Sequence, residues 1–380
     1  MNRLRAIGAI VALAVAAVAG TACRREPPSI ATLGERIFND PALSRPDGQA
    51  CADCHAPHVA FRDPESDRAT SAGIVGGSFG VRNAPTLMYA RFVPELHRDA
   101  DGAWRGGMMW DGRGGSFEHQ AGFPLLNPLE MNNPDQAAVV ATVRAASYAG
   151  ELRARFGEHA LDDVPTAFEH IADAIAAFER TPTFAPFTSK YDRYLAHRSQ
   201  LTGAEQRGLA IFEDSARGNC AGCHPSRPGA DGTPPLFTDF GYANLGIPKY
   251  GNNGFYTQAH AVNPAGAEYV DHGLMATVKD PAQDGKFRVP TLRNIARTGP
   301  YGHNGYFDNL PYLLDFLNTR DSHSPDPAVK PWAEPEVPAN LETRVGHLHL
   351  TDAELQDLDA FLETLTDVLP KAPPPVRSAR

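Results

Sequence analysis

Two copies of the pattern Cys-x-x-Cys-His constrain this chain more than any other feature of its sequence. One copy is Cys51-Ala52-Asp53-Cys54-His55, and the other is Cys220-Ala221-Gly222-Cys223-His224. Two thiols three residues apart on one helical turn can bond both vinyl groups of a haem, and the adjacent histidine then points back at the iron. The sequence therefore predicts two covalently attached c-type haems, with His55 and His224 as proximal iron ligands.

Other uses of paired cysteines fit the sequence less well. A zinc ribbon places its Cys-x-x-Cys units roughly 15–20 residues apart, whereas these units begin at Cys51 and Cys220. A thioredoxin-like motif lies in a βαβ setting, and no such pattern flanks either copy. The fifth cysteine, Cys23, lies outside both motifs.

The first residues have the pattern of an export signal. Arg3 and Arg5 precede a short apolar run, Ala6 to Gly20, which is too short to span a bilayer with ease. We therefore expect residues 1–22 to be a signal peptide and the mature protein to work in the periplasm. Cys23 is then the first mature residue, either acylated as in a lipoprotein or unmodified, and such a lipid anchor is the single membrane attachment that we expect.

The two halves of the chain resemble each other beyond the haem motifs. Gly34 to Asp40 precedes the first motif and Gly208 to Asp214 precedes the second, with an Ile-Phe pair in each. A Pro-Thr-Leu triplet follows each motif, at Pro85 to Leu87 and at Pro290 to Leu292. A repeat of such a long period predicts two similar domains related by internal duplication.

The expected fold is mainly α, with two cytochrome c-like haem domains and long loops. An apolar helical face runs from Phe168 to Phe178, and Thr-x-x-Glu capping boxes at Thr202 and Thr351 open two further helices. The 34 glycines and 33 prolines indicate long irregular connections. We expect an N-terminal peroxidatic haem domain over residues 23–185 and a C-terminal electron-transfer haem domain over residues 186–372.

The charge of the chain bears on its partners. The formal net charge is −10 and no basic stripe is present, which argues against a nucleic-acid partner. An acidic surface fits either attraction of a basic electron donor or an ordinary solvated surface.

Further motifs are spread over the chain from Leu33 to about Asp367. They are Leu33-Gly34, Arg82-Asn83-Ala84-Pro85, Trp110-Asp111-Gly112-Arg113, Asn127-Pro128-Leu129-Glu130-Met131, Val289-Pro290-Thr291-Leu292-Arg293-Asn294, and Pro300-Tyr301 followed by His303 and Gly305. Together with the haem motifs, they make the chain resemble the bacterial di-haem cytochrome c peroxidases and their MauG-type relatives. The resemblance implies that the N-terminal haem reacts with hydrogen peroxide and that the C-terminal haem passes electrons in.

The resemblance also implies catalytic roles for three residues. Glu130 matches the family's buried carboxylate, which moves a proton from the iron-bound oxygen of peroxide to the leaving oxygen. Gln120, ten residues earlier, matches the family's distal-pocket glutamine. Trp110, ten residues earlier again, matches the tryptophan between the haems, whose indole can relay charge. Each residue alone has an ordinary structural explanation, but the matched spacing inside flanking motifs favours function.

One departure from the family concerns the first haem. Many peroxidases of the family keep this haem inactive with a distal histidine from the loop before the Arg-Asn-x-Pro segment. Here that loop, residues 69–77, contains no histidine. We therefore expect the first haem to be five-coordinate without reductive activation, which is a MauG-like property.

A second departure concerns the other haem. In the family its sixth ligand, Met or Tyr, lies fourteen residues after the histidine of the Pro-Tyr-x-His-x-Gly segment. Counting from His303 reaches Leu317, which cannot bind iron, and the matching position in the first half is Pro124. Our hypothesis is that the second haem lacks a protein sixth ligand, or takes water or hydroxide. The alternative is that the ligand comes from Tyr312, Met275 or His323.

A calcium ion is a further expectation from the resemblance. The family holds it between the haem domains through an asparagine side chain and two backbone carbonyls, which here are those of Asn83, Thr298 and Pro300. Oxygen-only ligation suits this hard cation. The alternative is that these residues only shape turns.

Three functions stay open on the sequence. The first is a di-haem peroxidase that reduces hydrogen peroxide to water with electrons from a small cytochrome c or a cupredoxin. The second is a MauG-type enzyme that uses a high-valent di-haem state to oxidise Trp or Tyr of a partner protein, a reading that Leu317 and the histidine-free loop favour. The third is a non-enzymatic electron-transfer cytochrome, which Glu130 and Gln120 together argue against. Relatives in the peroxidase branch are often dimers, so a homodimer is also expected.

Overall fold

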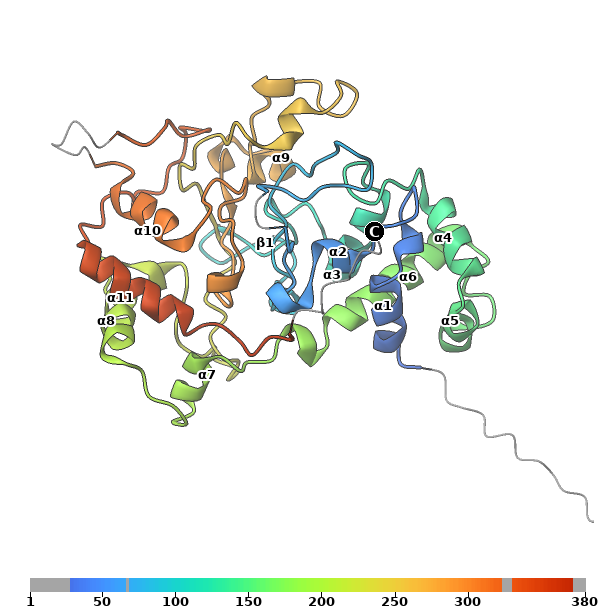
Figure 1. The fold of residues 1–380 in the computed structure, drawn as a ribbon, viewed down its shortest axis with the longest axis horizontal. Helices are drawn as coiled ribbons and strands as arrows, with labels where there is room; N and C mark the ends of the chain where they lie inside the picture. The colour runs from blue at the N-terminus through green and yellow to red at the C-terminus, as the bar shows by residue number, and fades with distance from the viewer. Residues whose placement is uncertain (1–27, 66–67, 323–329, 372–380) are drawn as a thin grey trace, which may run out of the picture.

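The computed structural model describes residues 28–65, 68–322 and 330–371, and it is mainly α-helical, as predicted (Figure 1). The predicted signal peptide, Cys23 and His323 lie outside the described residues. The described residues form eleven α-helices: α1 (Ile30–Phe38), α2 (Cys51–Cys54), α3 (Phe117–Leu126), α4 (Gln136–Ala145), α5 (Ala149–Phe156), α6 (Val164–Glu179), α7 (Lys190–Leu195), α8 (Gly203–Glu213), α9 (Leu274–Val278), α10 (Leu310–Thr319) and α11 (Asp352–Glu363). Short 3₁₀ helices lie between these elements, and two short antiparallel strand pairs are present: β1 (His97–Arg98) with β2 (Trp104–Arg105), and β3 (Tyr242–Ala243) with β4 (Phe287–Arg288).

Two large hydrophobic cores follow each other along the described chain. The first gathers buried residues between Leu33 and Ala185, and the second gathers those between Tyr191 and Leu365. Figure 1 shows α1 and α3–α6 in the right-hand part of the molecule, and α7, α8, α10 and α11 in the left-hand part. This arrangement agrees with two domains, and the exact boundary near residue 185 stays a prediction.

In the first core, α1 crosses α6 at a glycine. Helix α1 buries Ile37 and Phe38 on the same side as Gly34. A Cβ atom at Gly34 would lie 1.8 Å from the carbonyl oxygen of Ala174 and 2.9 Å from Cβ of Phe178. Only glycine therefore lets the two backbones approach this closely.

In the second core, α8 crosses α11 in the same way. The predicted capping boxes at Thr202 and Thr351 are confirmed, and they begin these two helices. A Cβ atom at Gly208 would lie 1.9 Å from the carbonyl oxygen of Asp357 and 2.8 Å from Cβ of Phe361. Each haem motif thus follows a helix that is locked by a glycine against the last helix of its core.

Replacing Gly34 with alanine should lower the free energy of unfolding by about 3 kcal/mol, because the added methyl group overlaps the α6 backbone. Denaturant unfolding of the haem-loaded protein measures the change. Gly150 is the control, since it lies in α5 with no heavy atom within 4 Å of an added Cβ. There alanine should leave stability unchanged or slightly raised, and equal losses at both positions would contradict the account of the crossing.

Helices α3 and α10 hold corresponding places in the sequence of the two halves. Each has ten residues and begins after a capping side chain, Ser116 for α3 and Asn309 for α10. Pro124 is the eighth residue of α3, and Leu317 is the eighth residue of α10. The structure therefore gives these two residues the same helical position, as the count along the sequence predicts.

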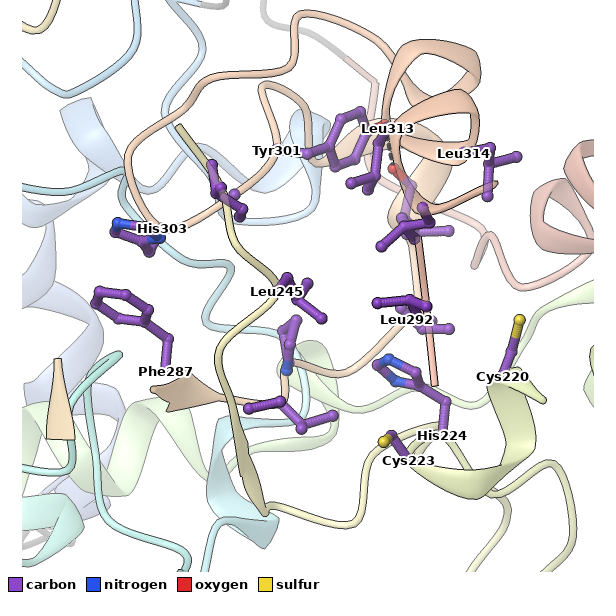
Figure 2. Close-up of a pocket in the computed structure, with 18 of the residues that line it drawn as sticks. Cys220, Cys223, His224, Leu245, Phe287, Leu292, Tyr301, His303, Leu313 and Leu314 are labelled. Carbon is purple, nitrogen blue, oxygen red and sulfur yellow. Dashed lines mark hydrogen bonds between the residues drawn. The ribbon is translucent and has the colours of Figure 1, made fainter. Parts of the chain in front are cut away.

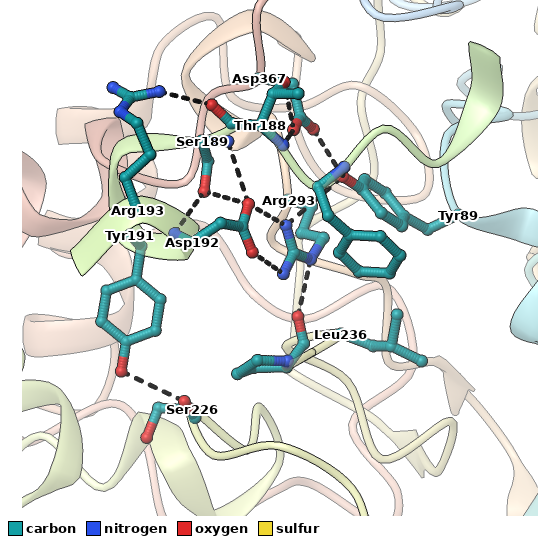
Figure 3. Close-up of polar contacts among 12 residues, drawn as sticks. Tyr89, Thr188, Ser189, Tyr191, Asp192, Arg193, Ser226, Leu236, Arg293 and Asp367 are labelled. Carbon is teal, nitrogen blue, oxygen red and sulfur yellow. Dashed lines mark hydrogen bonds and ion pairs between the residues drawn. The ribbon is translucent and has the colours of Figure 1, made fainter. Parts of the chain in front are cut away.

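A buried polar cluster joins the two halves (Figure 3). Arg293, only 1% exposed, forms two bonds of 3.0 and 2.8 Å with the carboxylate of Asp192. Its guanidinium also lies 4.8 Å from the centre of the Tyr89 ring. The Tyr89 hydroxyl and the Asn294 amide both donate to Asp367, over 2.7 and 2.9 Å. Tyr89 thereby connects the first core to residues of the second.

Candidate functional site

The first haem motif places a half-buried histidine directly after a short helix. Cys51 and Cys54 begin and end α2, and His55 follows directly. Nδ1 of His55 lies 3.0 Å from the carbonyl oxygen of Phe61, to which it donates. This bond leaves Nε2 as the free lone pair, and burial lowers the pKa of the ring, so that it is neutral as a metal ligand must be.

The second motif repeats this arrangement. His224 donates through Nδ1 to the carbonyl oxygen of Phe237 over 2.8 Å, and burial lowers its pKa. Phe61 and Phe237 both have left-handed backbones, with φ of 53° and 52°. Figure 2 shows Cys220, Cys223 and His224 together at one end of a large cavity.

The half-buried thiols of the two motifs favour covalent attachment over metal ligation. Burial is the largest cause that raises the pKa of all four motif cysteines, to about 12 for Cys54 and Cys220. Zinc would bind these cysteines as thiolates, so their thiols would first have to lose their protons. No set of three or more His, Cys, Asp or Glu side chains within the described ranges could hold a metal ion. Uncharged thioethers to a haem suit these environments better.

One cationic side chain in the cavity beside His224, the second cavity, also fits a haem. The Arg288 guanidinium lines the cavity and donates to the carbonyl oxygen of Met109 over 3.1 Å. Arg288 has no ion pair with an acidic side chain in the part of the chain that the structure describes. Burial lowers its pKa, which marks an uncompensated charge. A haem propionate would supply the missing anion.

Glu130 lies near the first haem motif. Asn127 donates from Nδ2 to Oε1 of Glu130 over 2.8 Å. Burial raises the pKa of Glu130 in spite of this bond. The carboxylate is close enough to Cys51 and Cys54 to contribute to their raised pKa values. The histidine-free loop 69–77 rests on this segment, because Ile74 N–H donates to the Glu130 carbonyl over 2.9 Å.

Gln120 lies on α3, four residues before Pro124 and therefore on the same face of the helix. Both side chains are half-buried. The side-chain stem of Gln120 packs against Gly114, where an added Cβ would lie 3.3 Å from it. No described hydrogen bond joins Gln120 to Glu130, so its place in the active site stays a prediction from this shared face.

Trp110 lies on the wall of the second cavity, although it belongs to the first half of the chain. Its indole Nε1–H donates to the carbonyl oxygen of Asn83 over 2.9 Å, and its own carbonyl accepts from Arg288 N–H over 2.8 Å. The first bond holds the indole against Asn83, and the second joins the backbone of Trp110 to the second half of the chain. The role of Trp110 as a relay between haems stays a prediction.

The three predicted calcium-binding residues line the same cavity wall as Trp110. Asn83 donates from Nδ2 to the carbonyl oxygen of Ala69 over 3.3 Å, which leaves its amide oxygen for a cation. Thr298 and Pro300 lie two residues apart, and each has a backbone carbonyl oxygen. The donor set is made of oxygen atoms only, so the residues fit calcium.

A buried ion-pair cluster lies directly beside Asn83. Arg82 binds Asp271 over 2.6 and 2.7 Å and lies 2.8 Å from the carboxylate of Asp111. Burial alone would raise the pKa of Asp271, but Arg82 holds it at about 2. The motifs around Arg82 and Asp111 were visible in the sequence, whereas nothing there singles out Asp271.

Glu179 is a buried residue that the sequence motifs did not identify. It ends α6, is 5% exposed, and its Oε2 has no hydrogen-bond partner. Burial raises its pKa to about 8, and its charge acts on Cys51. Glu179 lies five residues after Ala174, the residue that faces Gly34. Leu362 lies five residues after Asp357, which faces Gly208, so the two side chains hold matching places in α6 and α11. Leu362 lines the second cavity. A carboxyl thus stands beside the first haem motif where the second has an apolar side chain.

Replacing Glu179 with glutamine should change how stability depends on pH. Between the ordinary pKa of 4.5 and the raised value of about 8, the folded protein keeps a proton that the unfolded chain releases. The stability present at low pH is therefore lost as the pH rises toward 8. The variant should melt close to the parent at pH 5 and roughly 2–5 °C higher at pH 8. Exposed Glu158, changed to glutamine, should show no such pH-dependent difference.

Known proteins similar to this chain include a MauG protein, a cytochrome c peroxidase and a diheme peroxidase. Residues 28–200 match the family model described as di-haem cytochrome c peroxidase. The methylamine utilization protein MauG of Paracoccus denitrificans is 43% identical, over 97% of this chain and 96% of that protein. The cytochrome c peroxidase Ccp of Escherichia coli is 31% identical, over 88% of this chain and 58% of that protein. The crystal structure of the diheme peroxidase BthA from Burkholderia thailandensis superposes with a TM-score of 0.77 and 35% identity, covering 90% of this chain and 87% of that one.

Proposed function

Because this chain belongs to the di-haem cytochrome c peroxidase family, we propose that it reduces hydrogen peroxide to water with electrons from a small redox protein. Peroxide reacts at the haem of Cys51, Cys54 and His55, and the haem of Cys220, Cys223 and His224 passes electrons in. The observation that carries the proposal is the half-buried Glu130 beside the first motif, whose carboxyl pKa is raised by loss of solvation. It gives that site a carboxyl group able to move protons.

The residues of the first site handle the protons. A haem bound at each motif supplies an iron that accepts and donates single electrons. Reduction of one peroxide molecule takes two electrons and two protons and releases two water molecules. Glu130 takes the proton from one peroxide oxygen and delivers it to the other, which leaves as water. Asn127 holds Oε1 of Glu130 in one orientation through its 2.8 Å bond, and Gln120 offers an amide donor to the substrate.

Electrons from the second haem pass by way of Trp110. The indole lies on the wall of the second cavity and belongs to the chain segment that leads into α3. Its bond to Asn83 keeps the ring in one position. A calcium ion held by Asn83, Thr298 and Pro300 would fix the same wall.

A MauG-type reaction is the second candidate, in which the two electrons come from Trp or Tyr side chains of a partner protein. Loop 69–77 favours it, because the loop has no histidine and is bonded to the Glu130 backbone. No imidazole from this loop can therefore cover the first haem. The 43% identity to the MauG protein of Paracoccus denitrificans points the same way.

The remaining sequence-based expectations form part of the proposal. Gly34 and Gly208, with their matched helix crossings, support an origin of the two domains by duplication. Covalent haem attachment fits export to the periplasm, with Cys23 free or lipid-anchored. No helix in the described ranges has both the length and the apolar character needed to cross a membrane. A homodimer stays a prediction.

Peroxide-dependent oxidation of a reduced small cytochrome c or cupredoxin tests the choice between the two reactions. The peroxidase reading expects two donor proteins oxidised for each peroxide consumed. If donors stay reduced while peroxide oxidises Trp or Tyr in a co-purified partner, the MauG-type reading replaces it. If the haem-loaded protein does not react with peroxide at all, both enzyme readings fail.

A further inference from the structure

The face that α10 turns toward the second haem motif is made of leucines. Leu310, Leu313, Leu314 and Leu317 follow the i, i+3, i+4, i+7 spacing of one helical face, and all four line the His224 cavity. Figure 2 shows Leu313 and Leu314 on the far side of the cavity from His224. Leu245, Ile247 and Leu348 extend the same apolar lining.

The leucine face cannot turn away from the cavity. Asn318 exchanges two hydrogen bonds with the backbone of Leu350, over 3.0 and 2.9 Å. Phe316 is fully buried in a separate apolar cluster with Phe307 and Ile247. These contacts fix the rotation of α10 about its axis and so keep Leu317 on the cavity side.

Few described side chains could replace Leu317 as an iron ligand. Besides His224, the cavity lining holds one imidazole, His303, and one phenol, Tyr301. The Tyr301 hydroxyl donates to the carbonyl oxygen of Ile295 over 2.6 Å. The His303 ring stacks on Phe287 with ring centres 3.6 Å apart, and Figure 2 shows this pair well away from His224.

The ligands considered from the sequence do not line the cavity. Tyr312 is 38% exposed and packs against Tyr306 and Trp332. Met275 lies on α9, outside the cavity lining. His323 is outside the described residues.

The corresponding face of α3 has a different chemistry. Gln120 is the fourth residue of α3, where α10 has Leu313, and Glu130 follows a few residues after α3 ends. The first haem motif therefore has polar groups on this side, and the second has none from its helix. The leucine face itself offers no hydrogen bond to a water or an anion beside it, although Arg288 and His303 line other parts of the same cavity.

We propose that the second haem is held by His224 alone, and that the leucine-lined space of α10 is a binding site for a small uncharged diatomic molecule such as carbon monoxide or nitric oxide. The inference rests on the proposed haem at Cys220, Cys223 and His224. It sharpens the expectation of an open coordination position, because the leucine face of α10 offers no hydrogen bond to water, hydroxide or another anion at that position. The chain then has two open haems with opposite ligand preferences.

Haem content is measured first, by the pyridine haemochrome spectrum of the full chain. Fewer than two haems c per chain counts against the proposed function itself. With two haems present, the dithionite-reduced protein should bind two carbon monoxide molecules per chain, and the ferric protein should bind one azide. One carbon monoxide per chain with a low-spin ferric signal in the electron paramagnetic resonance spectrum overturns the inference, as do two azides of equal affinity.

Variants locate the site. Leu317→Met places a thioether where the leucine lies, so it should reduce carbon monoxide binding to one per chain and add a low-spin ferric signal. Leu355→Met makes the same chemical change on α11 outside the cavity lining, and it should leave two. His303→Gln should also leave two and change no spin state. An unchanged Leu317→Met protein, or a low-spin signal that His303→Gln removes, contradicts the assignment.

Discussion

Replacing Glu130 with glutamine should slow the reaction of the oxidised protein with hydrogen peroxide by about 10²–10³-fold, the usual range for loss of a proton-transfer group. Glutamine keeps the size of the side chain and can still accept the Asn127 bond at its amide oxygen. It cannot take a proton from one peroxide oxygen and return it to the other. Stopped-flow absorbance of the haem Soret band gives the rate directly.

The matched control for this variant is Glu118→Gln. Glu118 lies on α3 with Gln120, but its carboxylate pairs with Arg180 at the surface. Its removal should change the peroxide rate less than threefold. A Glu130→Gln protein that reacts as fast as this control, with two haems and an unchanged ferric spectrum, would falsify the proton-transfer role.

Replacing Arg293 with methionine should lower the free energy of unfolding by about 3–5 kcal/mol, because it leaves a buried carboxylate unpaired. Asp192 would lose both of its bonds to Arg293, and the carbonyl oxygen of Pro235 would lose a donor at 2.6 Å. The stacking of the guanidinium on Tyr89 and Phe187 would be lost as well. Denaturant unfolding of the haem-loaded protein measures the loss.

Arg207 provides the control for exposure. It also binds an aspartate through two bonds, each of 2.7 Å to Asp357, but its side chain is 64% exposed. Arg207→Met should therefore cost less than about 1 kcal/mol. Similar losses in the two variants would show that the Arg293 cluster contributes no more than a surface ion pair.

The local features of the fold could be predicted from the sequence. The haem motifs, the capping boxes at Thr202 and Thr351 and the repeated glycines depend on residues a few positions apart. The matching helical positions of Pro124 and Leu317 could also be found by counting along the sequence, because α3 and α10 start at the same distance from matching glycines. Each of these features lies within one helix or turn, so it does not depend on contacts between distant segments of the chain.

The contacts between distant segments could not be predicted. Arg293 was visible inside a motif, but its partner Asp192 lies in another segment and carries no pattern of its own. Asp271 and Glu179 were missed for the same reason, since a lone acidic residue in the sequence gives no sign of its burial. The leucine lining of the second cavity could not be predicted because it depends on the rotation of α10 about its axis. That rotation is fixed by hydrogen bonds of Asn318 with the backbone of Leu350, which is distant in the sequence.

The glycine crossings also determine when each haem pocket can close. Cys51 comes soon after α1, but α6, the helix that α1 must cross, begins only at Val164. Cys220 likewise follows α8, and its closing helix α11 begins at Asp352. A chain that emerges N-terminus first therefore exposes each cysteine pair for more than a hundred residues of growth before its pocket can form. The thiols are accessible to covalent chemistry during that interval, and a chain cut short before α11 keeps its second pair open permanently.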